Sequence, residues 1–132
     1  MAENRVIAVL RRYTAAAFAR DWDALAETLA DSYRMEDRRT GLKNTYDKAG
    51  DMERAKVTAD VGFDDLMVEA VEARGEGCAL LRAKLSAKAA DYAIESLLVV
   101  RVDTNDRMAE AFLFEAEDLE SARAQLAMIA GC

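Results

Sequence analysis

The spacing of apolar residues changes from a helical repeat to a strand repeat along this chain, and the change limits the folds open to it. At the start, apolar side chains recur every three or four residues, which is typical of one face of an amphipathic helix. This stripe consists of Val6, Val9, Leu10, Tyr13 and Ala17. From residue 65 onward, short apolar segments alternate with turn residues, which indicates antiparallel hairpins.

Turn and cap residues define the other elements. Asp21 can cap a second, shorter helix. Residues 33–37 alternate as a strand, and residues 45–56 predict a third helix, which Gly50 weakens. The four later strands are expected at residues 66–73, 78–86, 92–102 and 107–114, and a closing helix is expected at residues 119–129.

This order of elements predicts the fold class. Helices gathered on one side of a mainly antiparallel sheet form an α+β fold, and 132 residues fit one domain. We therefore expect a single domain over residues 1–132 with a strongly curved sheet. The N-terminal helices would pack into its concave face and leave a hollow at the open end.

Charge and composition limit the partners. The net charge is −7, and an acidic surface repels phosphate backbones and anionic lipids, so neither nucleic acid nor membrane is an expected partner. The apolar runs are too short to span a bilayer and the N-terminus does not resemble a signal peptide, so we expect a cytoplasmic location.

The absence of histidine limits the chemistry. The sequence has none, which removes Ser-His-Asp and Cys-His nucleophiles and the commonest metal ligand. Two cysteines, Cys78 and Cys132, have no metal or redox spacing, and Cys78 is interpreted as a small core residue. No metal and no cofactor is predicted, so any acid–base step would use Asp, Glu, Tyr or Lys.

Asp37 is the strongest candidate for such a step. It shares a strand face with Tyr33 and Met35, and burial of that face would raise the pKa of the carboxyl group toward that of a general base. The alternative is structural, because Arg38 and Arg39 follow directly and either could form an ion pair with it. Both interpretations stay open.

Two aromatic residues carry similar alternatives. Tyr13 lies on the apolar stripe of the first helix, so its hydroxyl group either finds a partner in the core or points into the hollow. Trp22 begins the second helix, where it either packs between helix and sheet or stacks on a ligand.

The head of the chain, RYTAAAFARDWDALAETLADSYRMEDR, and its tail, LLVVRVDTNDRMAEAFLFEAEDLESA, resemble the nuclear transport factor 2-like superfamily over roughly residues 5 to 130. That group includes ketosteroid isomerase, SnoaL-like polyketide cyclases, limonene-epoxide-type hydrolases and non-catalytic binding domains. The resemblance implies a cone-shaped, curved antiparallel sheet of the cystatin-like α+β roll type. It also implies a homodimer that pairs through the outer face of the sheet.

Three positions can be matched to ketosteroid isomerase. Tyr13 is similar to the tyrosine that donates a hydrogen bond to the developing oxyanion, and Asp37 is similar to the general base. Leu98 falls where the isomerase has a protonated carboxylic acid, so the oxyanion site would lack its second donor. This departure counts against steroid-type isomerisation.

The sequence therefore predicts a pocket for a small apolar molecule, with two functions open. One is acid–base catalysis of an isomerase, cyclase or hydrolase kind, using Asp37 and Tyr13. The other is a non-catalytic module for ligand binding or dimerisation, since one fold serves many activities. The expected ligand-binding residues are Tyr33, Met35, Trp22, Leu98, Phe112 and Phe114.

Overall fold

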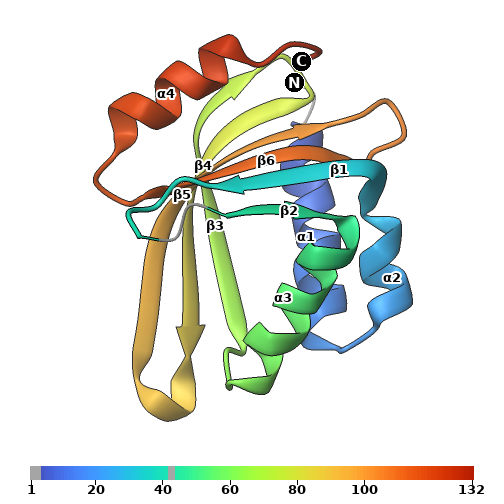
Figure 1. Cartoon of the computed structure of the whole chain (residues 1–132), viewed down its shortest axis with the longest axis vertical. Helices are drawn as coiled ribbons and strands as arrows, with labels where there is room; N and C mark the ends of the chain where they lie inside the picture. Colours follow the sequence, from blue (N-terminus) through green and yellow to red (C-terminus); the bar gives the residue numbers. More distant parts are fainter. Residues whose placement is uncertain (1–3, 42–43) are drawn as a thin grey trace.

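A computed structural model describes residues 4–41 and 44–132. Its six strands form one curved, unclosed sheet in the order β2-β1-β6-β5-β4-β3 (Figure 1). The predicted α+β class is confirmed. In chain order, the elements are α1 (Arg5–Phe18), α2 (Trp22–Glu27), β1 (Leu29–Asp37), β2 (Thr45–Asp47), α3 (Lys48–Asp60), β3 (Asp65–Arg74), β4 (Cys78–Ala87), the 3₁₀ turn η1 (Lys88–Ala90), β5 (Tyr92–Val102), β6 (Met108–Glu115) and α4 (Leu119–Met128).

Strand pairing departs from a simple meander at one place. Strands β3 to β6 pair antiparallel through short turns, as their sequences predict. Strand β1, however, runs parallel to β6, with Met35 opposite Ala111 and Asp37 opposite Leu113. The chain leaves β1 through β2 and α3, crosses to the far edge and returns strand by strand, which brings its first long strand beside its last.

The predicted third helix begins later than expected. Residues 45–47 form the short edge strand β2, and α3 runs from Lys48 to Asp60. The Asp47 side chain accepts a hydrogen bond from the Gly50 backbone N–H at 2.8 Å, which caps the helix. A Cβ on Gly50 would lie 3.2 Å from the capping oxygen of Asp47, so glycine leaves room for this cap.

Helices cover both faces of the sheet. Figure 1 shows α1, α2 and α3 on one side and α4 lying across the other. The predicted apolar stripe of α1 packs into the concave side, where Val6, Val9 and Leu10 are at most 2% exposed. The Asp21 side chain caps α2 by accepting from the Ala24 backbone N–H, as predicted.

Helix α4 covers the convex face of β4, β5 and β6. Its Ala122 and Leu126 pack with Leu97 and Val99 of β5 and with Phe114 of β6 in one buried cluster. Strand β5 is apolar on both faces because one faces the concave core and the other faces this helix. The second apolar face therefore has a partner within the chain, and the homodimer stays a prediction.

A disulfide bond joins Cys78 at the start of β4 to Cys132. No local pattern predicts this bond, because the two cysteines are 54 positions apart and only the packing of α4 brings them together. The Arg74 Nη1 also donates to the backbone oxygens of Leu126 and Ala127 at 2.8 and 2.6 Å, which holds the end of α4. Because disulfides persist mainly in oxidising compartments, this bond counts against the cytoplasmic location.

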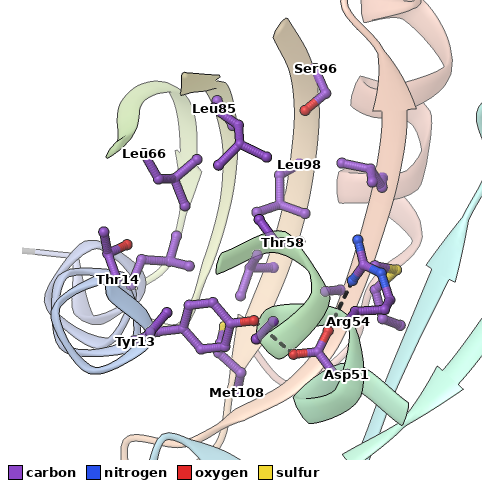
Figure 2. Close-up of a pocket in the computed structure, with 18 of the residues that line it drawn as sticks. Tyr13, Thr14, Asp51, Arg54, Thr58, Leu66, Leu85, Ser96, Leu98 and Met108 are labelled. Atoms are coloured by element: carbon purple, nitrogen blue, oxygen red, sulfur yellow. Dashed lines mark hydrogen bonds and ion pairs between the residues drawn. The ribbon is translucent and has the colours of Figure 1, made fainter. Parts of the chain in front are cut away.

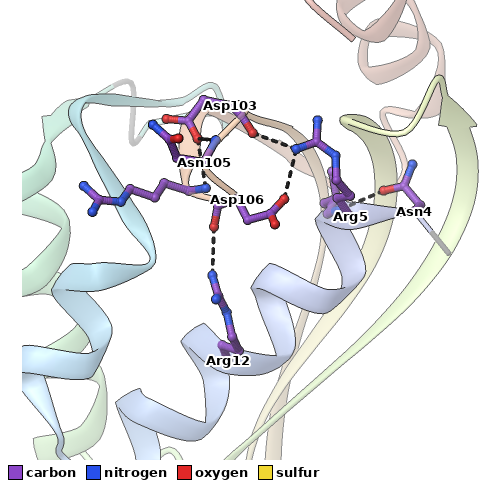
Figure 3. A network of polar contacts seen from close by, with 8 residues as sticks. Asn4, Arg5, Arg12, Asp103, Asn105 and Asp106 are labelled. Atoms are coloured by element: carbon purple, nitrogen blue, oxygen red, sulfur yellow. Dashed lines mark hydrogen bonds and ion pairs between the residues drawn. The ribbon is translucent and has the colours of Figure 1, made fainter.

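The turn between β5 and β6 is fixed by the first helix. Figure 3 shows Arg5 and Arg12 of α1 reaching toward this turn. Arg5 Nη1 donates to the Asp103 backbone oxygen and to the Asp106 carboxylate, and Arg12 Nη2 donates to the Asp106 backbone oxygen. These contacts hold the helix across the concave face. No helix of the two described segments is long and apolar enough to cross a membrane.

Candidate functional site

A cavity of about 320 Å³ lies in the concave side of the sheet, beneath α1 and α3. This volume is at the lower end of the range for small-molecule sites. Figure 2 shows Leu66, Leu85 and Leu98 projecting from the sheet, with Tyr13 and Thr14 approaching from α1. Most of the wall is apolar. The apolar lining residues from the strands are Met35, Leu66, Ala83, Leu85, Ile94, Leu98, Val100, Met108, Ala111 and Leu113.

One end of this cavity holds a buried polar cluster centred on Asp51. The Tyr13 hydroxyl donates to Asp51 Oδ2 at 2.8 Å, and the Tyr33 hydroxyl donates to Oδ1 at 3.2 Å. Arg54 Nη1 also donates to Oδ1, at 3.1 Å, and forms an ion pair with the carboxylate. Two of these contacts are drawn in Figure 2. The cluster joins α1, β1 and α3, and all four of its side chains line the cavity.

Burial changes the proton affinity of each acid in the cluster. Desolvation raises the pKa of the Asp51 carboxyl, and the charge of Arg54 with the hydrogen bonds from Tyr13 and Tyr33 only partly offsets it. Burial, followed by the charge of Asp51, also raises the pKa of Tyr13 and of Tyr33 well above the usual tyrosine value. Both phenols are therefore neutral donors at physiological pH.

The arrangement leaves Asp51 some capacity to accept a proton. A carboxylate offers about four acceptor positions, and the described residues fill three of those of Asp51. Asp51 is 2% exposed, yet it lines the cavity, so a bound molecule would meet it in surroundings nearly free of bulk water. Such a group suits proton transfer to or from a ligand.

The sequence-based candidate base, Asp37, has a different environment. It is 4% exposed, but its carboxylate is held by Arg39, with Nε to Oδ1 at 3.0 Å and Nη2 to Oδ2 at 2.7 Å. Burial alone would raise the pKa of Asp37, and the hydrogen bonds from Arg39 outweigh it and lower the pKa. Among the described residues, Arg39 lines the cavity and Asp37 does not.

The other predicted site residues lie in three places. Tyr13, Tyr33, Met35 and Leu98 line the cavity. Phe112 and Phe114 lie on the opposite face of β6 with α4, because Ala111 and Leu113 occupy the face toward the cavity. Trp22 packs with Ala16, Ala17, Leu25 and Ala55 between the helices. The roles predicted for the four residues that line the cavity, in catalysis or ligand binding, stay predictions.

Sequence reasoning missed Asp51 and Arg54. Helix α3 has no clear apolar stripe, so no local pattern indicates which of its residues face the core. The one available signal was the cap at Asp47, which would have placed Asp51 in the first helical turn. Among the described residues, no three acidic or cysteine side chains lie close enough together to hold a metal ion.

Comparison with known proteins supports the fold. No protein-family profile matches the sequence, and no curated protein does. The solved structures include a candidate ketosteroid isomerase from Kribbella flavida, with a TM-score of 0.64, 18% identity and coverage of 87% of this chain and 80% of that one. A candidate polyketide cyclase from Sinorhizobium meliloti aligns with a TM-score of 0.57, 22% identity and coverage of 80% and 92%.

A third solved structure, a protein of unknown function with a cystatin-like fold from Methylobium petroleophilum, aligns with a TM-score of 0.66, 13% identity and coverage of 89% and 79%. The chain thus shares its fold with these solved structures, and the fold expected from the resemblance in its sequence is confirmed. Identities this low carry no activity across, because the same fold serves unrelated functions.

Proposed function

We propose that this protein binds a small, mainly apolar molecule in its concave cavity and transfers a proton to or from it through Asp51. The reaction would be of an isomerase, cyclase or hydrolase kind. The observation that carries this proposal is a carboxylate that is 2% exposed, lines an apolar cavity and has a raised pKa. The superfamily fold is consistent with the proposal but does not specify the reaction.

In this proposal the neighbours of Asp51 have distinct tasks. Tyr33 and Arg54 hold the carboxylate in one orientation from β1 and α3. Tyr13 donates to Asp51, and its oxygen keeps lone pairs that can accept a hydrogen bond from the ligand. The role first predicted for Asp37 passes to Asp51, because Asp37 is engaged by Arg39 outside the cavity lining.

A second candidate function is ligand binding without chemistry. The three donors around Asp51 favour it, because hydrogen bonds to a carboxylate stabilise the ionised form and weaken it as a base. The two candidates differ in one measurable property, which is whether the cavity accelerates removal of a proton from a bound molecule.

Proton abstraction from 5-nitrobenzisoxazole measures that property. This neutral aromatic probe needs only a base: loss of its C3 proton breaks the N–O bond and leaves a cyano group and a phenolate whose absorbance is recorded. We expect Asp51→Asn to lower the rate by about 10²-fold or more, the usual effect of a positioned base. Asp37→Asn should keep most of the rate. The wild-type rate should rise with pH through a midpoint above the ordinary aspartate pKa of about 3.9, because the ionised form of Asp51 is the active one.

Substitutions at two adjacent positions of α3 test whether the reaction takes place in the cavity. Thr58 lines the cavity, so Thr58→Trp should fill it and remove the activity. Val57 is 59% exposed, so Val57→Trp adds the same side chain outside and should leave the rate unchanged. A wild-type rate equal to that of Asp51→Asn would refute catalysis and leave binding alone. Equal rates in the two tryptophan variants would refute the cavity as the site.

A further inference from the structure

Two guanidinium groups line the cavity. Arg39 reaches it from the segment after β1, and Arg54 reaches it from α3. Among the described lining residues, Asp51 is the only one with a carboxylate. The wall therefore has more cationic than anionic groups, although the whole chain has a net charge of −7. Each guanidinium is paired with a buried carboxylate, Arg39 with Asp37 and Arg54 with Asp51, so what it offers a ligand is the N–H donors that remain.

The two arginines lie near the same side chains. The Arg54 guanidinium stacks over the Tyr46 ring at 4.8 Å, and Tyr46 is also among the groups that raise the pKa of Arg39. The charge of Arg54 likewise helps to lower the pKa of Asp37, the direct partner of Arg39. Tyr46 pairs with Met35 on β1, two residues before Asp37, so the groups that contact the two arginines lie along the same stretch of β1.

Each guanidinium retains donors after its internal contacts. Arg39 uses Nε and Nη2 for Asp37, and Arg54 uses Nη1 for Asp51. A guanidinium group has five N–H donors, so the hydrogen bonds among the described residues leave Nη1 of Arg39 and Nη2 of Arg54 for other acceptors. The two side chains are 22% and 33% exposed, so each is already oriented and partly shielded from water.

We propose that the ligand carries a carboxylate, which the guanidinium groups of Arg39 and Arg54 bind while its apolar body fills the rest of the cavity. Guanidinium groups bind carboxylates through paired, charge-assisted hydrogen bonds. Asp37 and Asp51, which hold the two arginines, repel negative charge. This repulsion favours a ligand head group with one negative charge over a phosphate group, which carries up to two negative charges at neutral pH. The inference rests on the proposed function only in placing the ligand in the same cavity.

A matched pair of probes tests the head group. 2-Naphthoate and 2-naphthamide have the same aromatic body and differ mainly in charge, and their binding can be followed by calorimetry. We expect the wild-type protein to bind 2-naphthoate about tenfold to a hundredfold more tightly than the amide, the scale of hydrogen bonds between charged groups. Added salt should weaken binding of the carboxylate and leave the amide nearly unaffected.

Substitutions of individual arginines test which of them produces the preference for the carboxylate. Arg54→Gln should remove most of the preference for the carboxylate. Arg38→Gln is the matched control, because Arg38 lies outside the cavity lining and contacts Glu36 and Gln125. If Arg39→Gln fails to fold because Asp37 loses its partner, the double variant Asp37→Asn/Arg39→Gln removes both charges and tests the same point.

The outcomes separate this inference from the proposed function. Tight binding of the amide with no preference for 2-naphthoate would overturn the carboxylate assignment while the binding cavity stands. Binding of neither probe would overturn both the assignment and the cavity as a site for apolar aromatic molecules. A carboxylate preference that survives both Arg54→Gln and the Asp37/Arg39 double variant would refute the role of the two arginines.

Discussion

Removing the disulfide between Cys78 and Cys132 tests how the C-terminal helix contributes to stability. Cys132→Ser abolishes the crosslink and leaves Cys78, which is fully buried, as a small core residue. The contacts of Arg74 with the end of α4 persist in this variant, so the helix should stay docked. The main effect should therefore be greater freedom of the unfolded chain.

The size of this effect follows from the length of the closed loop. The two cysteines are 54 positions apart. The chain-entropy relation for a loop of this size gives a loss of about 4 kcal/mol in the free energy of unfolding at room temperature. Because small domains are stable by only about 5–15 kcal/mol, the variant should unfold at a much lower urea concentration.

Urea denaturation followed by circular dichroism measures this loss directly. Wild-type protein treated with a dithiol reductant is the control, because it lacks the same crosslink without any substitution. The reduced wild type and Cys132→Ser should unfold at closely similar urea concentrations, both well below the oxidised wild type. If the free energy of unfolding of both proteins falls by less than about 1 kcal/mol, the chain-entropy argument is refuted.

Two further predictions concern Asp37 and the oligomeric state. Asp37→Asn should destabilise the fold by about 2 kcal/mol near neutral pH by removing charged hydrogen bonds from Arg39. The folded-state pKa of Asp37 is lowered, so its contribution to the free energy of unfolding is fully present above the unfolded-state pKa and should vanish as pH falls through the folded-state pKa. Urea denaturation that shows a constant difference in the free energy of unfolding between wild type and Asp37→Asn down to pH 2 would contradict this prediction. Sedimentation velocity at micromolar concentration should find a homodimer. Helix α4 covers β4 to β6 and leaves β3 open on the outer face, where Met67 is 62% exposed, so Met67→Asp should give monomers. A wild-type monomer would exclude the dimer.

Local sequence patterns predicted most of the elements because those patterns are set by nearby residues. The α1 stripe at Val6, Val9 and Leu10, the Asp21 cap and the bounds of β5 match the structure closely. The third helix was misplaced by three residues, since β2 is too short to show an alternation of its own and Asp47 was not recognised as a cap. The parallel pairing of β1 with β6 has no local signal.

The candidate site was predicted only in part. Tyr13, Tyr33 and Leu98 were expected at the cavity and line it. The two phenylalanines of β6 were assigned to the wrong face, because Ala111 and Leu113 make the other face equally apolar and alternation alone cannot choose between them. The sequence therefore indicated a cavity and several of its walls, but not the acid inside it.

By itself, the sequence determined the order of the helices and of every strand except β2, the α+β class and the tyrosine on the first helix, because each depends on spacing within a short segment. Only the tertiary structure decided which carboxylate meets the cavity. Asp51 lies on a helix without an apolar stripe, and its burial arises only when that helix docks between Tyr13 and Tyr33. The disulfide was decided in the same way, since contacts between distant segments depend on how the whole chain packs.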